Sequence, residues 1–243
     1  MQVDADSYRA LARSSPWRWR TLHFSHREGR GQVEAWVRRP GELVVRLSSG
    51  AEHYSSGAPY TVSRAAIVST PEGRVEVDPW ESIDPDPQPT FRPDGLVDTR
   101  PHDYHLEHGD PMWGNYTWTA MLDPDELSHD VEVDDVRSAE LDGRELWWAR
   151  LRPVDGYEPR CGCCALLWSE VAAIGEYGDD PDRLARFRAE GFPDAHDVAL
   201  DVQTGVVAAL QPVGGHGDRG FTLEIHEVDA DLGAVFAGRS PRS

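Results

Sequence analysis

The chain has 243 residues, of which 39% are hydrophobic, and its 43 acidic and 24 basic residues give a net charge of −19. This composition supports a packed core, and the excess of negative charge argues against nucleic acid as a partner. No apolar run approaches the length of about 18 residues that spans a bilayer, so no transmembrane segment is expected. Three cysteines are too few for a disulfide scaffold.

The first 15 residues carry Asp4, Asp6, Arg9 and Arg13 and therefore lack the apolar segment of a secretory signal. We expect a cytoplasmic protein on this basis. All basic residues are arginine, which excludes a lysine Schiff base and a P-loop lysine. The chain also lacks the serine-nucleophile elbow and the two-histidine zinc-protease motif, so we predict no catalytic residues and no enzymatic activity.

The first hundred residues predict one helix followed by consecutive strands. Asp6 is the expected N-cap, Tyr8 and Leu11 share one helical face, and Pro16 ends the helix. Period-two patterns predict strands at 17–24, 32–38, 43–48, 61–68 and 74–77. A Pro-Gly turn at 40–41 joins the second and third of these. Six prolines between 79 and 101 predict a long loop.

The rest of the chain continues the same pattern. Strands are predicted at 116–121, 131–139, 144–151, 197–203, 206–211 and 221–228. Asp123-Pro124 predicts the start of a helix of one or two turns, Asp180-Pro181 starts a clearer helix that Gly191 ends, and a short helix closes the chain at 231–236. Trp147 and Trp148 are adjacent on one strand and must therefore point to opposite faces.

The order of these elements predicts an α+β fold that is mainly β. Strands follow one another through hairpins and do not alternate with helices, which disfavours a parallel sheet. A sheet of nine or ten strands must also curl. We therefore predict a single large curved antiparallel sheet, an incomplete barrel, with short helices covering its concave face.

Three segments resemble the lipoprotein-carrier and sigma-regulator superfamily typified by LolA, RseB and the mycobacterial LppX-like lipoproteins. They are a strand, Pro-Gly turn and basic return strand at 32–46, a Gly-Arg element before an apolar strand at 141–150, and a Thr-Gly hairpin at 198–207. The resemblance implies a single LolA/RseB-like domain over 1–243 with insertions at about 79–115 and 160–195. It also implies an apolar cavity under the helices that binds lipid-like ligands, or a role as a sensor in envelope signalling. Superfamily members are usually exported, and this chain departs from them in showing no export signal.

Tryptophans are the candidate ligand-binding residues. The chain has 9 of them, and five lie on predicted strands, where several would line the concave face and contact an apolar ligand. These five are Trp17, Trp19, Trp36, Trp118 and Trp147. The alternative is that they fill an ordinary core.

Cysteines and histidines are the candidate metal ligands. Cys161, Cys163 and Cys164 fall within four residues, and three readings stay open for them: a site for a cation such as zinc, a redox-active pair, or buried reduced thiols. A second pair of Cys or His, which structural zinc sites normally have, is not evident. A weaker signal is His102, His105 and His108 at spacings of three, followed by Asp110. His23 and His26 are weaker still, because the same spacing on a strand points them to opposite faces.

The sequence thus favours a non-enzymatic binding or regulatory protein with an apolar cavity, whose partner is an apolar small molecule or another protein. The alternative is a metal- or thiol-dependent enzyme that uses the three cysteines. Neither the ligand nor an oligomeric state has a signature in the sequence.

Overall fold

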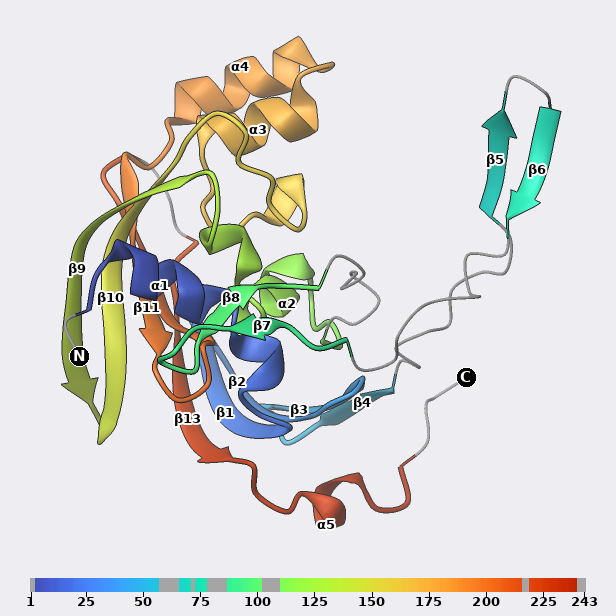
Figure 1. Cartoon of the computed structure of the whole chain (residues 1–243), viewed down its shortest axis with the longest axis vertical. Coiled ribbons are helices and arrows are strands. Elements are labelled where there is room, and N and C mark those ends of the chain that lie inside the picture. Colours follow the sequence, from blue (N-terminus) through green and yellow to red (C-terminus); the bar gives the residue numbers. More distant parts are fainter. Residues whose placement is uncertain are drawn as a thin grey trace.

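A computed structural model describes residues 3–56, 66–70, 73–77, 87–101, 110–215 and 219–239. Its main element is an antiparallel sheet of nine strands in the order β4-β3-β2-β1-β13-β12-β11-β10-β9 (Figure 1). The nine strands are β1 (Thr21–Glu28), β2 (Gly31–Arg38), β3 (Glu42–Leu47), β4 (Glu52–Ser56), β9 (Val131–Leu141), β10 (Arg144–Pro153), β11 (Ala195–Asp201), β12 (Val207–Val213) and β13 (Phe221–Val228). Pairing of β1 with β13 joins an N-terminal and a C-terminal meander into one sheet.

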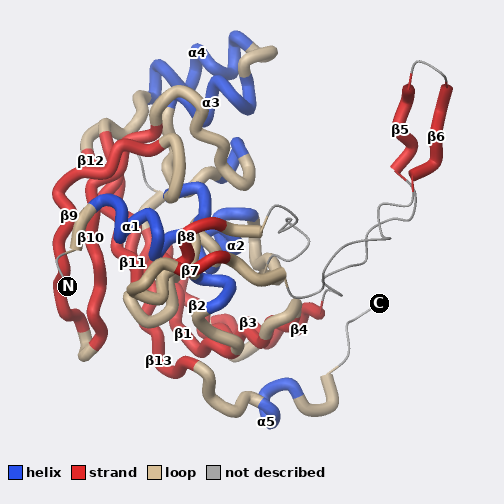
Figure 2. Tube along the Cα trace, in the orientation of Figure 1, coloured by secondary structure: helices blue, strands red, loops and turns tan. Residues whose placement is uncertain are grey.

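Short helices pack on the sheet and at its end (Figure 2). They are α1 (Ala5–Ala12), α2 (Tyr116–Leu122), α3 (Glu170–Tyr177), α4 (Pro181–Glu190) and α5 (Gly233–Phe236), with 3-10 turns η1 (Ser15–Trp17), η3 (Asp125–Leu127) and η4 (Gly162–Cys164). The sheet curls around α1, α2 and the small hairpin of β7 (Thr90–Phe91) and β8 (Val97–Thr99), whereas α5 lies on the outer side (Figure 1). A separate hairpin pairs β5 (Ala66–Thr70) with β6 (Gly73–Val77). The predicted fold class is therefore confirmed: a curved, unclosed antiparallel sheet with short helices on its concave side.

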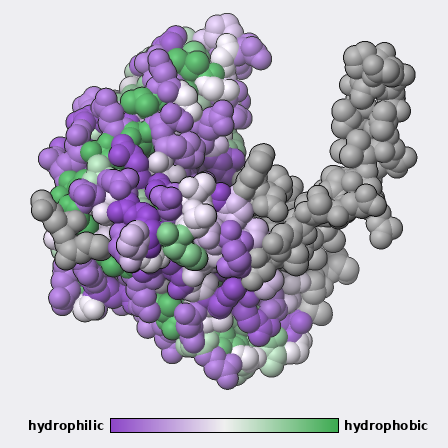
Figure 3. Space-filling model, viewed as in Figure 1, coloured by the Kyte–Doolittle hydropathy of each residue, from purple (hydrophilic) through white to green (hydrophobic). Residues whose placement is uncertain are grey.

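Local patterns explain most of the strands. In β13, Phe221, Leu223 and Ile225 are buried in the main core while the residues between them are exposed. In β10, Trp147 joins the main core and Trp148 packs against a cluster on the opposite face, as predicted from the strand period. The surface that Figure 3 shows is mostly hydrophilic, because such alternation keeps apolar side chains inside.

Two sequence predictions near tryptophans are wrong. Residues 116–121 form helix α2 and not a strand, because the Asn115 side chain accepts a hydrogen bond from the Thr117 N–H (2.9 Å) and caps the helix. Trp118, Met121 and Leu122 then share one buried helical face, so the alternation of aromatic and threonine residues concealed a helical period. The strand predicted at 17–24 begins only at Thr21, after the 3-10 turn that contains Trp17.

Helix boundaries also differ from the prediction in places. The N-cap of α1 is Asp4 rather than Asp6, and its carboxylate accepts the Ser7 N–H (2.8 Å). Asp123 closes α2 instead of capping the following turn, which is a single 3-10 turn. Strand β4, helix α3 and hairpin β7–β8 were not predicted, and the hairpin lies within the proline-rich stretch assigned to a loop. Residues 61–65 of the predicted strand at 61–68 lie outside the described residues.

The concave face is filled by the protein's own side chains. The main core contains Tyr8 and Leu11 of α1, Leu122 of α2, and inward residues of β1, β2, β3, β10, β11, β12 and β13. Tyr8, Leu11 and Leu122 have no exposed surface. A hollow barrel of the kind the resemblance implied is therefore absent from the described part of the chain, and a sizeable pocket lies at one end of the sheet.

Candidate functional sites

A pocket of about 410 Å³ opens where the ends of β1, β2 and β3 meet the first turn of α2. Its lining combines apolar and polar groups. The lining residues are His26, Glu28, Gly31, Gln32, Val33, Leu47, Ser48, Ser49, Trp113, Gly114, Asn115, Thr117, Trp118 and Met121. This volume lies within the range of about 300–1,000 Å³ that small-molecule sites occupy.

His26 forms part of the pocket wall and is uncharged near neutral pH. Its ring lies between those of Trp118 and Phe221, with centroid distances of 5.4 and 5.3 Å. Burial among these rings lowers the pKa of His26 to about 4, because the imidazolium form would lose its hydration. The pocket therefore offers a neutral imidazole beside indole rings.

Trp118 brings an unsatisfied donor to the same place. The side chain is only 4% exposed, and within the described residues its indole N–H has no hydrogen-bond partner. Its ring packs on Phe24 at a centroid distance of 5.3 Å. A buried donor without an acceptor costs about 1–3 kcal/mol, so an acceptor that reached Trp118 from the pocket would recover this energy.

The structure separates the five tryptophans that the sequence grouped together. Only Trp118 lines the pocket. Trp19 and Trp147 lie in the main core, and the Trp17 indole N–H donates to the carbonyl of Pro87 (3.1 Å). Trp36 points to the outer face.

On that outer face Trp36 packs with Leu232 and Phe236 in a second cluster and stacks on His23 at 4.7 Å. His23 and His26 therefore do lie on opposite faces, as predicted. Two pocket residues were not predicted from the sequence. Trp113 lies in a loop that has no strand or helix periodicity, and His26 was only a weak candidate because of its spacing from His23. Their convergence with Trp118 comes from the packing of α2 on β1.

The three cysteines converge in η4. Cys161 and Cys163 have their Sγ atoms 3.1 Å apart, Cys163 and Cys164 have theirs 3.9 Å apart, and all three lie within 4.8 Å of one another. All are free thiols; Cys164 is buried and Cys163 is exposed.

Their acidities differ. Burial opposes ionisation of Cys161, but hydrogen bonds from the Cys164 and Cys163 thiols and from the backbone N–H groups of the same residues outweigh it and lower the pKa of Cys161. Burial raises the pKa of the Cys164 thiol to about 12. In an isolated thiol cluster, Cys161 is thus the first to ionise.

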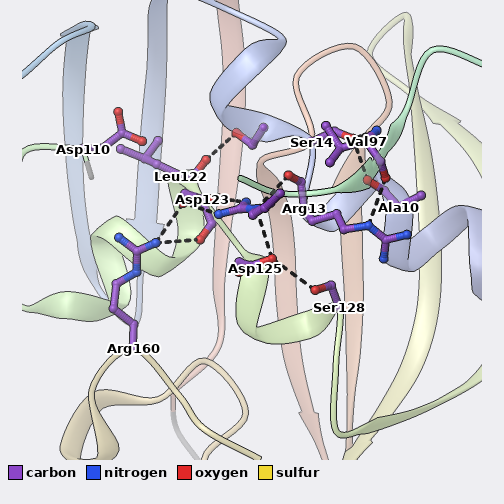
Figure 4. A network of polar contacts seen from close by, with 12 residues as sticks. Ala10, Arg13, Ser14, Val97, Asp110, Leu122, Asp123, Asp125, Ser128 and Arg160 are labelled. Carbon is purple, nitrogen blue, oxygen red and sulfur yellow. Dashed lines mark hydrogen bonds and ion pairs between the residues drawn. The ribbon is translucent and has the colours of Figure 1, made fainter. Parts of the chain in front are cut away.

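A buried ion network ties α2 to the rest of the core (Figure 4). Asp123 is 2% exposed; Arg100 donates to both of its carboxylate oxygens, and Arg160 donates to one of them at 2.9 Å. Burial alone would raise the pKa of Asp123, but the two guanidinium groups lower it to about 2. This network stabilises the turn between α2 and η3.

The histidine-rich stretch yields no site. His102, His105 and His108 lie outside the described residues. Asp110, which follows them, is nearly buried and accepts two hydrogen bonds from Arg39, at 2.8 and 2.7 Å. The Asp110 carboxylate is therefore engaged in an ion pair.

No protein-family model matches the sequence, and no curated protein shows significant sequence similarity to it. The fold resembles several solved structures. A chain in the complex structure of Pseudomonas aeruginosa MucA/MucB shares 12% identity with a TM-score of 0.33, over 94% of this chain and 59% of that one. LprF from Mycobacterium bovis shares 9% identity with a TM-score of 0.35, over 94% of this chain and 96% of that one. LolA superfamily protein NE2245 from Nitrosomonas europaea shares 8% identity with a TM-score of 0.24, over 98% of this chain and 99% of that one.

One of these structures is described as a LolA superfamily protein, the superfamily that three segments of the sequence resemble. This chain spans 59% of the length of the matched chain in the MucA/MucB complex and 62% of the chain in a crystal structure of MucB. Because all of these TM-scores lie below 0.5, no conclusion about family or function rests on these likenesses, and function is inferred from the residues of this chain. Among its described residues, no helix has the length and apolar character needed to cross a bilayer.

Proposed function

We propose that this protein is a non-enzymatic binding protein that takes the apolar part of a small amphipathic ligand into the pocket beside α2. The observation that carries the proposal is the pocket of about 410 Å³ with Trp113, Trp118 and Met121 in its wall. Apolar area that leaves water there contributes roughly 25 cal/mol per Å². The filled concave face limits the ligand to this end of the sheet, which differs from a carrier that threads a long chain through a hollow barrel.

The polar part of the ligand is expected to carry a hydrogen-bond acceptor and no negative charge. The unpartnered indole N–H of Trp118 supplies a donor, and the Asn115 and Thr117 side chains at the rim are polar. Glu28 also lines the pocket and adds negative charge, so an anionic group on the ligand would be disfavoured there. A neutral carbonyl or hydroxyl compound with one apolar group fits these features.

The test uses two variants of neighbouring residues on β2. Val33 lines the pocket, whereas Glu34 points to the other face, where its carboxylate contacts His23 (2.9 Å) and Arg46 (2.9 Å). Val33→Phe fills the pocket, and Glu34→Phe adds the same ring outside it. Binding of the probes 1-anilinonaphthalene and 1-octanol is measured by fluorescence and by calorimetry.

Wild-type protein should bind one probe molecule, Val33→Phe should bind at least about tenfold more weakly, equivalent to 1.4 kcal/mol, and Glu34→Phe should match wild type. Thermal unfolding confirms that both variants are folded. Equal probe binding by folded Val33→Phe, or none by wild type, would remove the proposal. Native mass spectrometry of the protein as purified, before and after solvent extraction, identifies any ligand that it carries.

A thiol-dependent enzyme receives less support. In the described part of the chain, the contacts of the three sulfurs are with one another, with backbone N–H groups, and electrostatically with Glu176. A thiol nucleophile needs a general base beside it, most often histidine, and no such pair stands among these contacts.

A further inference from the structure

Three sulfur atoms gather at one point of the surface in a geometry close to that of a bound metal. Zinc–thiolate bonds of about 2.3 Å in a tetrahedron place neighbouring sulfurs about 3.8 Å apart. The observed Sγ separations are 3.9 Å for Cys163 and Cys164 and 3.1 Å for Cys161 and Cys163. All three sulfurs lie within 4.8 Å of one another.

The backbone of this loop is fixed on both sides before any ion binds. The buried carboxylate of Glu126 accepts the N–H of Arg160 (3.0 Å), just before the first cysteine, and the N–H of Leu166 (2.9 Å), just after the last. The Tyr157 hydroxyl donates to the same carboxylate (2.6 Å). A site held this way loses little entropy when it closes around an ion.

Two further contacts attach the cysteines to neighbouring elements. The Thr117 hydroxyl of α2 donates to the carbonyl of Cys164 (2.8 Å), and a guanidinium N–H of Arg219 donates to the carbonyl of Cys163 (3.2 Å). The Cys164 N–H also donates to the carbonyl of Cys161 (3.2 Å), which closes the turn that holds the three cysteines together.

One carboxylate and two guanidinium groups flank the loop. Glu176 of α3 packs on Gly162 so closely that a Cβ at this position would lie 2.6 Å from its Oε2 atom, and it interacts electrostatically with Cys163. The Arg160 side chain is turned to Asp123 (2.9 Å), and Arg219 contacts the Cys163 carbonyl (3.2 Å), so within the described residues neither guanidinium donates a hydrogen bond to a sulfur. Cys163 is exposed, so an ion can reach the site from solvent.

We propose that Cys161, Cys163 and Cys164 bind one soft d10 cation, Zn²⁺ or Cu(I), through three thiolates. Thiolates prefer such ions over Mg²⁺ or Ca²⁺, and three sulfurs complete a trigonal Cu(I) site, whereas Zn²⁺ takes a fourth ligand from solvent or from Glu176. Binding releases the thiol protons to solvent. The ion would join the loop more firmly to α2, one wall of the ligand pocket, without taking part in a reaction.

The experiment titrates the full-length protein, reduced and freed of metal, with Zn²⁺, with Cu(I) under anaerobic conditions and with Co²⁺, against a chromophoric chelator. We expect one ion per chain, a sulfur-to-cobalt charge-transfer band, and a higher melting temperature with the ion bound. Comparing the Zn²⁺ and Cu(I) affinities identifies the preferred cation. Cys161→Ser and Cys163→Ser should each weaken binding more than about 100-fold, the upper end for loss of an outer-shell contact.

Two further variants test whether the histidines or Glu176 also bind the ion. Replacing His102, His105 and His108 with alanine should leave the affinity unchanged, and Glu176→Gln should lower Zn²⁺ affinity more than Cu(I) affinity. Because Cys163 is exposed, Cys163→Ser tests the site even where changes at buried Cys164 prevent folding. Binding that persists in folded Cys163→Ser, binding lost in the histidine variant, or three thiols that take up no ion after reduction would overturn the proposal.

Discussion

Replacing Asp123 with asparagine is the sharpest test of how the core is held together. The side chain keeps its size, but its charge disappears between two guanidinium groups, and one oxygen is exchanged for an NH₂ that faces donors. Arg160 still has the main-chain carbonyl of residue 123 as an acceptor (3.3 Å), and Arg100 keeps its ion pair with the Asp125 carboxylate (3.1 Å). The two arginine side chains are only 12% and 11% exposed, so water compensates poorly.

Two estimates bracket the expected loss. The carboxyl pKa falls from 3.8 to about 2 on folding, which at 1.36 kcal/mol per pKa unit corresponds to about 2 kcal/mol of stability near neutral pH. Breaking a buried ion pair costs about 3–5 kcal/mol, and the contact of Arg100 with Asp125 places this case at the lower end. We therefore expect Asp123→Asn to lower the free energy of unfolding by about 2–4 kcal/mol.

The pH dependence has a definite sign. Because the folded pKa is depressed, the unfolded chain takes up the proton first, and this contribution to stability is complete above the unfolded pKa of 3.8 and lost as the pH falls toward about 2. The difference between wild type and Asp123→Asn should therefore be constant from pH 5 to 7 and shrink in more acidic buffer.

Urea unfolding followed by tryptophan fluorescence measures the difference. The matched control is Asp134→Asn on β9, whose ion pair with Arg152 is exposed, with exposed side-chain fractions of 57% and 42%. This control should change stability by less than about 0.5 kcal/mol. An Asp123→Asn variant within 1 kcal/mol of wild type, at an unchanged urea slope, would show that the two arginines find other partners and that the network is not a major source of stability.

Two further predictions concern a buried histidine and a glycine turn. Burial lowers the pKa of His196 from 6.5 to about 4. Between these two pH values the unfolded chain binds a proton that the folded chain does not, so the stability of the fold decreases as the pH falls from 6.5 to 4. His196→Leu should reduce that loss by about 1–3 kcal/mol in unfolding curves recorded at pH 7 and pH 5, and an unchanged slope would contradict a buried neutral imidazole. Gly205 has φ of +74°, and a Cβ there would lie 2.9 Å from the carbonyl oxygen of Leu11, whereas Gly143 has φ of +76° with open space around it. Gly205→Ala should therefore destabilise the protein by about 1–3 kcal/mol more than Gly143→Ala, and equal losses would mean that α1 moves away at little cost.

The class of fold is predictable from the amino-acid sequence, because the signals for it are local. Period-two alternation in 221–228, the Pro-Gly and Thr-Gly turns at 40–41 and 204–205, and the Asp-Pro helix start at 180–181 each act over a few residues. Hairpins between successive strands then follow from chain connectivity. The same alternation gave a wrong prediction at 116–121, because a strand period of two and a helical spacing of three to four cannot be told apart over so short a segment. The side-chain cap at Asn115 favours the helix that the structure shows.

Which side chains meet depends on the three-dimensional packing of the chain. Trp36 and Trp118 look alike in the sequence, yet one faces outward and the other lines the pocket, because curling of the sheet and docking of α2 set the two faces apart. Asp123 finds Arg100 and Arg160 from positions 23 and 37 residues away along the chain. Contacts of this kind depend on long-range packing, and no short pattern of residues predicts its geometry. The three cysteines at 161–164 could be predicted to lie together only because they are neighbours in the chain.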